Sequence, residues 1–518
     1  MPTDSQMDSF VARRLAALAL LLGVVGQALV YGVALGVNVP ISVAMTIGAT
    51  WLARPPGSRL DPLDRWVGPA AIGFAVVVAL RADDALVALD AMAALGLTVM
   101  AAVALSGEPI TRRTAAAITD TGLRAMVVVL IGAAAILHAA RPAMPEPRAS
   151  LRRVSPVVRG LSLALPIVVI FALLFASADA VFERLLGDVV GLRIDLGDAP
   201  ARLMVVVALA WLAGGLFSVT RSEPASRRSL EPDPGPHSGA GPQGSGSTLA
   251  LQMAFPWPRI GAVEAIVVVA VVDLLFALFV GLQIAYLFGA RDTLAAAGLT
   301  YSDYARRGFF ELVVAAALAG GLIAALDRAT EPRGRRFVAL ALALVGLTAI
   351  VLASAALRLR VYQEAYAWTE LRFYVYAAIG WLGLGLTSAA VLLLRDRMGR
   401  LGHALVGSAM IVVVAANLIG PTAFVAARNV ERALDPSLVP AGGKTGFDAA
   451  YGAALGDDAI PTLVVALPRL APGEQAMLRT DLRRRWTELR TDPALTAPAA
   501  WNLGRERARS ALEELFGG

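Results

Sequence analysis

Two polar side chains stand inside long apolar stretches of this sequence. Asp273 lies near the middle of Gly261–Gly289, and Asn417 lies near the middle of the last apolar stretch. An ionisable group inside a membrane segment is costly and indicates a proton or ion path. The alternative is structural: a protonated Asp273 hydrogen-bonded to Asn417 or to a neighbouring backbone group. Asp90, in Ala85–Leu105, supports a weaker version of the same argument.

A second set of reactive residue types stands where a helix would enter the membrane, at Tyr301–Leu312. As a helix, this segment places Tyr304, Gly308 and Glu311 on one face. Glu311 then lies about one turn inside the boundary, where an unpaired carboxylate is costly. Either the segment is an interfacial anchor with Arg307 paired to Glu311, or Glu311 belongs to a buried polar site.

Three further polar clusters resemble this one in composition. They are Arg358–Tyr376, Arg428–Arg432, and Asp179 with Glu183 one helical turn apart. The orientation that the loop arginines predict places all four clusters on the outer side, which predicts an outward-facing polar cavity. The candidate ligand-binding residues are Asp179, Glu183, Tyr301, Tyr304, Arg307, Glu311, Tyr362, Glu370, Arg372, Arg428 and Asn429.

The elements that must position these residues are long uncharged stretches. Leu15–Ala53, Leu203–Thr220, Phe337–Leu357, Phe373–Leu394 and Ala404–Ala427 contain no Asp, Glu, Lys, Arg or His. A spanning helix needs about 20 apolar residues, because its backbone must satisfy its own hydrogen bonds in hydrocarbon. Charged residues make up 17% of the chain, below the roughly 25% of soluble domains. The sequence predicts an all-α, polytopic membrane helix bundle of about 11–13 spans.

Arginines in short connections predict the orientation. Arg328–Arg336 and Arg395–Gly402 are arginine-rich, and positive short loops stay cytoplasmic. We therefore expect a multi-pass protein of the cell membrane with an extracytoplasmic C-terminus.

The first 140 residues fit this orientation less simply. Arg13 and Arg141 should both be inside, which requires an even number of spans between them, whereas we count about five candidates. Either one of the short segments Trp66–Leu80 and Ala125–Ala140 does not span, or the N-terminus is outside. The apolar run after Arg14 is too long for a cleavable signal peptide.

The composition changes along the chain and predicts five regions. We expect N-terminal membrane segments (1–140), membrane helices with an acidic outer loop (141–220), a Pro/Gly/Ser-rich disordered cytoplasmic linker (221–258), a C-terminal membrane half (259–427) and a small helical extracytoplasmic domain (428–518).

Several functional classes are disfavoured by composition. With no cysteine and three histidines, we expect no thiolate metal site, no other metal centre and no cofactor. The net charge of +6 is explained by loop arginines that set topology, so we expect the lipid bilayer and not nucleic acid as partner.

Several motifs, in order, resemble one bacterial group. They are Phe175–Phe182, Tyr301–Leu312, Ala365–Arg372, Asn429–Arg432, Asp457–Pro461 and Trp501–Arg505. The chain resembles the polytopic membrane proteins known only as domains of unknown function, of the four-one-five-three and four-one-seven-three type. The likeness covers most of Leu151–Gly518. It implies a bacterial, membrane-embedded protein without assigned activity or catalytic residues.

Two hypotheses about function remain open, and the sequence leaves it uncertain whether the protein is an enzyme. The first is a non-enzymatic envelope channel, transporter or sensor, whose outer polar cavity binds a small ligand or an envelope partner. The second is an enzyme acting on a lipid-linked substrate at the outer leaflet, with Asp179, Glu183 and Glu311 as acid/base or metal-binding carboxylates.

Overall fold

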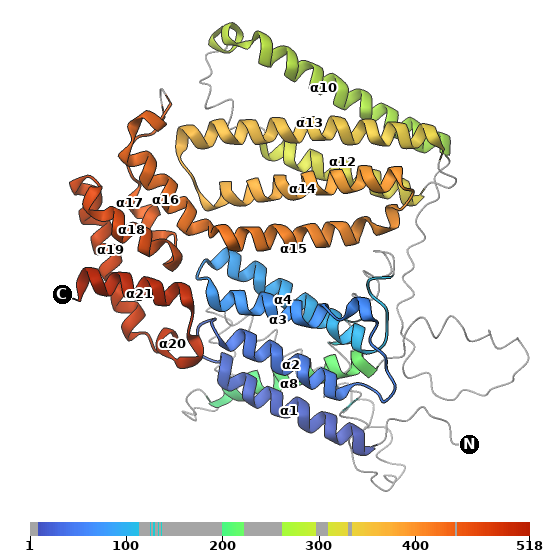
Figure 1. The fold of residues 1–518 in the computed structure, drawn as a ribbon, viewed down its shortest axis with the longest axis vertical. Helices are drawn as coiled ribbons and strands as arrows, with labels where there is room; N and C mark the ends of the chain where they lie inside the picture. Colours follow the sequence, from blue (N-terminus) through green and yellow to red (C-terminus); the bar gives the residue numbers. More distant parts are fainter. Residues whose placement is uncertain are drawn as a thin grey trace, which may run out of the picture.

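A computed structural model describes residues 9–112, 199–221, 262–296, 309–329, 334–440 and 443–517, with isolated positions between 125 and 136. These residues form α-helices joined by short turns, and none of them lies in a β-strand. The predicted all-α fold is thus confirmed. The helices form two stacked layers, and a smaller domain lies across one end of both (Figure 1).

The first layer contains the N-terminal helices. They are α1 (Ser9–Val30), α2 (Asn38–Ala53), α3 (Val67–Leu80), α4 (Asp84–Leu105) and α8 (Ala199–Arg221). Helix α1 packs along α8, and α3 packs between α2 and α4. We call this layer the N-terminal bundle.

The second layer is the C-terminal bundle. It contains α10 (Ala262–Ala296), α12 (Phe309–Ala329), α13 (Arg335–Tyr366), α14 (Glu370–Leu394) and α15 (Leu401–Ile419). Helix α13 packs against α10, α12 and α14, and α15 packs on α14. The two bundles meet where α15 lies along α4 (Figure 1).

Seven helices of the described part are long and apolar enough to cross a membrane. They are Phe10–Val30, Pro62–Leu80, Asp84–Leu105, Arg202–Arg221, Arg335–Tyr366, Glu370–Leu394 and Met398–Ile419. Three shorter apolar helices accompany them: Asn38–Ala53, Ala265–Gly281 and Ala315–Asp327. Leucines and valines on their outer faces are widely exposed, for example Leu418 at 79% and Leu274 at 72%, which suits a surface facing lipid.

The chain ends in a compact helical unit, which we call the C-terminal domain. It contains α16 (Pro421–Leu434), α17 (Ala449–Ala454), α18 (Ile460–Ala466), α19 (Pro472–Thr491), α20 (Pro493–Thr496) and α21 (Leu503–Phe516). One core unites α16 to α21 around leucines such as Leu463, Leu478 and Leu512.

The last span is shorter than the sequence predicted. Helix α15 ends at Ile419, because Gly420 has a φ of 70° and Pro421 starts a new helix.

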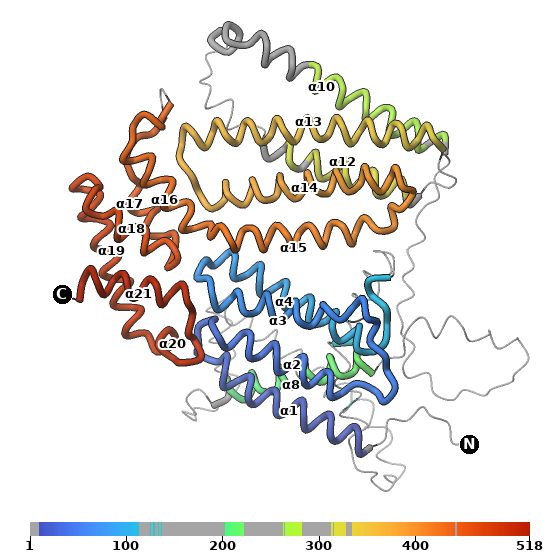
Figure 2. The backbone as a smooth tube through the Cα atoms, in the orientation of Figure 1, coloured from blue at the N-terminus to red at the C-terminus, as the bar shows by residue number. Residues whose placement is uncertain are grey.

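The two ends of the bundles differ. The turns α1–α2, α3–α4, α13–α14 and α15–α16 lie against the C-terminal domain, and we call this the domain end (Figure 2). At the opposite end lie the α2–α3 and α14–α15 connections, the segment after α4 and the start of α13. These segments carry arginines: Arg54, Arg59, Arg65, Arg112, Arg335, Arg336, Arg395, Arg397 and Arg400. We call this the arginine end.

The sequence left open how many spans the N-terminal region contains, and the helix directions bear on this question. Helices α1 to α4 alternate in direction, so the start of α1 and the end of α4 both lie at the arginine end (Figure 2). The short segment Trp66–Leu80 traverses the layer, because a 3-10 turn at Pro62–Asp64 extends α3. The other short segment, Ala125–Ala140, lies almost wholly outside the described residues.

Candidate functional site

The two bundles share a buried polar pair inside the membrane layer. The Nδ2 atom of Asn417 donates to Oδ1 of Asp90 over 2.9 Å, and it also donates to the carbonyl of Val413 at 3.0 Å. Asp90 is fully buried and Asn417 is 7% exposed. The guanidinium of Arg81 donates to the backbone carbonyl of Asn417. Hydrogen bonds therefore join α4 to α15 at the contact between the bundles.

A second carboxylate extends this pair toward the C-terminal domain. Asp83 caps α4 by accepting from the amide of Leu86 at 3.0 Å, and it accepts from the hydroxyl of Tyr374 in α14 at 3.2 Å. Asp83 is 1% exposed, and this burial raises the pKa of its carboxyl. We call Arg81, Asp83, Asp90, Tyr374 and Asn417 the junction.

The C-terminal domain holds the α3–α4 turn directly. The amide of Asn502 donates to the carbonyls of Val78 and Arg81, at 2.9 and 2.7 Å. The carboxylate of Asp458 accepts from the backbone N–H of Ala82 at 2.9 Å, and burial raises the pKa of this carboxyl. Each bond satisfies a backbone group that the helix ends leave unpaired.

The same domain holds the α1–α2 turn by close backbone contact. The N–H of Val37 donates to the carbonyl of Trp501 at 2.9 Å, and that of Ala34 donates to Ala494 at 3.0 Å. A Cβ at Gly36 would lie 2.4 Å from the carbonyl oxygen of Trp501. Only glycine fits at this contact.

A different helix of the C-terminal domain, α16, holds the α13–α14 turn. Asn429 and Trp368 form a reciprocal pair, in which the Asn429 side chain accepts from and donates to the Trp368 backbone, each at 2.9 Å. Arg432, 7% exposed, donates to the carbonyls of Ala365 and Lys444, each at 2.9 Å. Burial lowers the pKa of this guanidinium.

The candidates for ligand binding whose side chains are described all lie at the domain end. The guanidinium of Arg372 stacks 4.2 Å from the ring centre of Tyr362 and donates to the carbonyl of Tyr366 at 3.0 Å. The N–H of Glu370 donates to the Tyr451 hydroxyl at 2.9 Å. Arg428 is exposed and pairs with Glu431 at 2.8 Å. Asn429 and Arg372 are thus engaged with backbone carbonyls or amides, as helix-end partners.

The side chains of the remaining candidates from the sequence are not described. Asp179, Glu183, Tyr301, Tyr304 and Arg307 lie outside the described residues. Glu311 belongs to the first turn of α12, and its side chain is not among those described.

The structure does not contain the hydrogen bond between Asp273 and Asn417 that one hypothesis from the sequence included. Asn417 bonds Asp90, whereas Asp273 is buried in α10 and makes no hydrogen bond to a described residue. The junction residues Arg81 and Asp83 were not predicted, and Tyr374 was noted only as a member of the polar cluster Arg358–Tyr376. The Arg81–Asp84 turn, a short charged interruption between two apolar stretches, was the signal that could have identified them.

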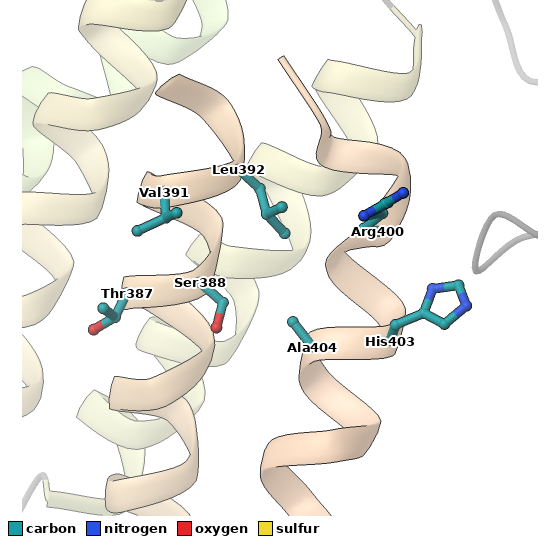
Figure 3. A pocket seen from close by; sticks show the side chains of 7 residues that line it. All are labelled: Thr387, Ser388, Val391, Leu392, Arg400, His403 and Ala404. Carbon is teal, nitrogen blue, oxygen red and sulfur yellow. The ribbon is translucent and has the colours of Figure 1, made fainter. Parts of the chain in front are cut away.

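One described cavity lies away from the junction, at the arginine end. It has a volume of about 440 Å³ between α14 and α15. Its lining residues are Thr387, Ser388, Val391, Leu392, Arg400, His403 and Ala404. Ala404 faces α14 across it, while the ring of His403 points away from α14 (Figure 3). The hydroxyls of Thr387 and Ser388 already donate to backbone carbonyls. Among the described residues, no group of three histidines, aspartates or glutamates could hold a metal ion.

The helices and their exposed apolar faces define a polytopic α-helical membrane protein. The family model described as "Domain of unknown function (DUF4153)" matches residues 69–466, and the chain belongs to this family. The match begins well before Leu151, where the sequence motifs first indicated it, and it ends before Trp501. No curated protein and no solved structure matches the chain.

The Asp90–Asn417 bond should couple the two bundles energetically. Asp90→Ala and Asn417→Ala should each destabilise the detergent-purified protein, and their combined effect should be smaller than the sum. We expect a coupling of about 1 kcal/mol, the range found for hydrogen bonds between membrane helices. Reversible unfolding in mixed micelles measures it. As a control, Asp90→Ala combined with Thr387→Ala, on an exposed face of α14, should be additive. Full additivity of the Asp90 and Asn417 substitutions would contradict the pairing.

Proposed function

We propose that this integral membrane protein is a non-enzymatic envelope sensor, in which the C-terminal domain responds to a small ligand or partner and changes the contact between the two bundles. The observation that carries the proposal is the position of the domain. It bonds the α1–α2 and α3–α4 turns of one bundle and the α13–α14 turn of the other. A change in the domain would therefore act on both bundles at once.

The junction consists of polar side chains, and this supports a contact between the bundles that can change. Away from the domain, the bundles meet chiefly along α4 and α15, where hydrogen bonds join Asp90 and Arg81 to Asn417. Polar groups inside a membrane are functional candidates, since apolar packing would hold helices together at lower cost. A transporter or channel would use the same contact. The enzyme alternative depends on Asp179, Glu183 and Glu311, whose side chains lie outside the described residues.

The proposal includes an orientation, with the domain end outside the cell. The arginine end carries the short basic turns, which favour the cytoplasm. The chain has no cysteine, so single cysteines give unambiguous labels.

Ser437→Cys, at the domain end, should react with an impermeant maleimide in intact cells. Gly334→Cys, at the arginine end, should react only after permeabilisation. Both positions are exposed, so differences in labelling report the side of the membrane. Labelling of Gly334→Cys in intact cells would reverse the orientation.

A cross-linking experiment tests whether the domain controls the junction. Ala94 of α4 and Val413 of α15 belong to one apolar cluster, one turn beyond the Asp90–Asn417 bond. With Ala94→Cys and Val413→Cys, oxidation in native membranes should form a disulfide within the chain. Adding Gly36→Ala should slow its formation several-fold, because a Cβ there would meet two carbonyls of the C-terminal domain.

The matched control is Gly48→Ala, in α2, where an added Cβ meets no atom within 4 Å. It should leave the cross-linking rate unchanged. If Gly36→Ala gives protein of normal yield that cross-links at the control rate, the domain does not act on the junction and the sensor proposal fails.

A further inference from the structure

A buried carboxyl in α10 lacks the kind of partner that Asp90 has. Asp273 is 8% exposed, and neither of its carboxyl oxygens has a hydrogen-bond partner among the described residues. The next residues, Leu274 and Leu275, are 72% and 63% exposed on the outer side of the helix. Asp273 therefore points inward from a lipid-facing helix.

The helix that covers Asp273 is α13. Helix α10 packs along α13, and both run from the arginine end toward the domain end (Figure 1). Val280, seven residues after Asp273, belongs to one cluster with Val351 and Ala355 of α13. Seven residues before Ala355 stands Thr348, so the parallel register places Asp273 within about one turn of the Thr348 level.

Thr348 is itself unusual. It is fully buried, and its hydroxyl has no hydrogen-bond partner among the described residues. Helical Ser and Thr side chains commonly donate to the carbonyl four residues earlier. Thr46, Thr50, Thr98, Thr220, Thr387 and Ser388 do so in this chain. Two buried polar groups at one level of the α10–α13 seam thus remain unsatisfied.

The described helices around this carboxyl offer no counter-charge at its level. Helix α13 has no titratable residue between Arg336 and Arg358, and the neighbouring α12 has none between Glu311 and Asp327. On α10 itself, the nearest titratable residue is Glu264, nine residues away, or about 13 Å along the helix. An ionised carboxylate in such surroundings would be strongly disfavoured.

We propose that Asp273 and Thr348 form a proton-binding site inside the C-terminal bundle. The ligand is a proton, because a neutral carboxyl needs no counter-charge, and the register places the neutral Thr348 hydroxyl within about one turn of its level. A metal cation would need more oxygen ligands than one carboxyl and one hydroxyl, and no cluster of acidic or histidine ligands occurs among the described residues. This proposal is independent of the junction and holds even if the C-terminal domain does not act on it.

A hydrophobic carbodiimide tests the site, since such reagents enter the bilayer and react with protonated carboxyls. The carboxyl oxygen bonds to the central carbon of dicyclohexylcarbodiimide and the proton passes to its nitrogen; acyl transfer then leaves a stable N-acylurea, with nothing lost. In the full chain in liposomes, mass spectrometry should find the adduct at Asp273, with a yield that falls as pH rises. Asp273→Asn should lose this adduct and Asp90→Asn should keep it.

Two further measurements test the role of Thr348 and distinguish a proton site from a sodium site. Thr348→Val should move the pH of half-maximal labelling upward, because a hydroxyl that donates to the carboxylate favours the ionised form; Thr387→Val, on α14, should not move it. Sodium ions at constant pH should give no protection. An unlabelled Asp273 at pH 6 in folded protein, protection by sodium, or a pH profile unaffected by Thr348→Val would each overturn the proposal.

Discussion

Backbone groups at helix ends must find partners, and this requirement governs one whole end of the molecule. A turn between two membrane helices leaves several N–H and C=O groups without intrahelical bonds. Water satisfies such groups at a free surface, but the turns at the domain end are covered by protein. Side chains of the C-terminal domain supply the partners: Asn502 and Asp458 for the α3–α4 turn, Asn429 and Arg432 for the α13–α14 turn.

This constraint explains why the polar clusters of the sequence need not be a ligand pocket. Arg372 and Asn429, two candidates for ligand binding, donate to backbone carbonyls next to them. Arg372 joins the start of α14 to the end of α13, and Asn429 joins the C-terminal domain to the α13–α14 turn. Function is then better sought in how the domain and the bundles move together than in a preformed cavity at that end.

The sequence predicted the membrane helices well, because their apolar length is a local property. Phe373–Leu394 became α14 almost without change, and Phe337–Leu357 became the apolar part of α13. The sequence also identified Asp90 and Asn417 as unusual. It could not pair them, because they are 327 positions apart and their contact depends on how two bundles pack. Gly36 is a similar case: its need for glycine arises from the carbonyl of Trp501, which only the folded chain brings near.

Two buried aspartates show how differently a membrane protein can treat one residue type. Asp90 receives a hydrogen bond from the facing helix and joins the bundles. Asp273 faces apolar surroundings without such a bond. The first therefore serves a contact between bundles, whereas the second, as we propose, binds a proton within one bundle.

Above all, we infer that the C-terminal domain holds both bundles as one cooperative unit. Hydrogen–deuterium exchange tests this cooperativity through the N–H groups of Val37, Ala82 and Trp368, each of which donates to the domain from a different turn. Gly504→Ala places a Cβ 2.1 Å from the Asp458 carboxylate and 2.9 Å from Ala82, so it acts where the domain contacts the α3–α4 turn. Gly473→Ala, with no atom within 4 Å of the new Cβ, is the control.

If the domain and the bundles open together, Gly504→Ala accelerates exchange in peptides from all three turns, while Gly473→Ala changes none of them. Faster exchange confined to the peptide that contains Ala82 would contradict this cooperativity, because the domain would then hold each turn independently.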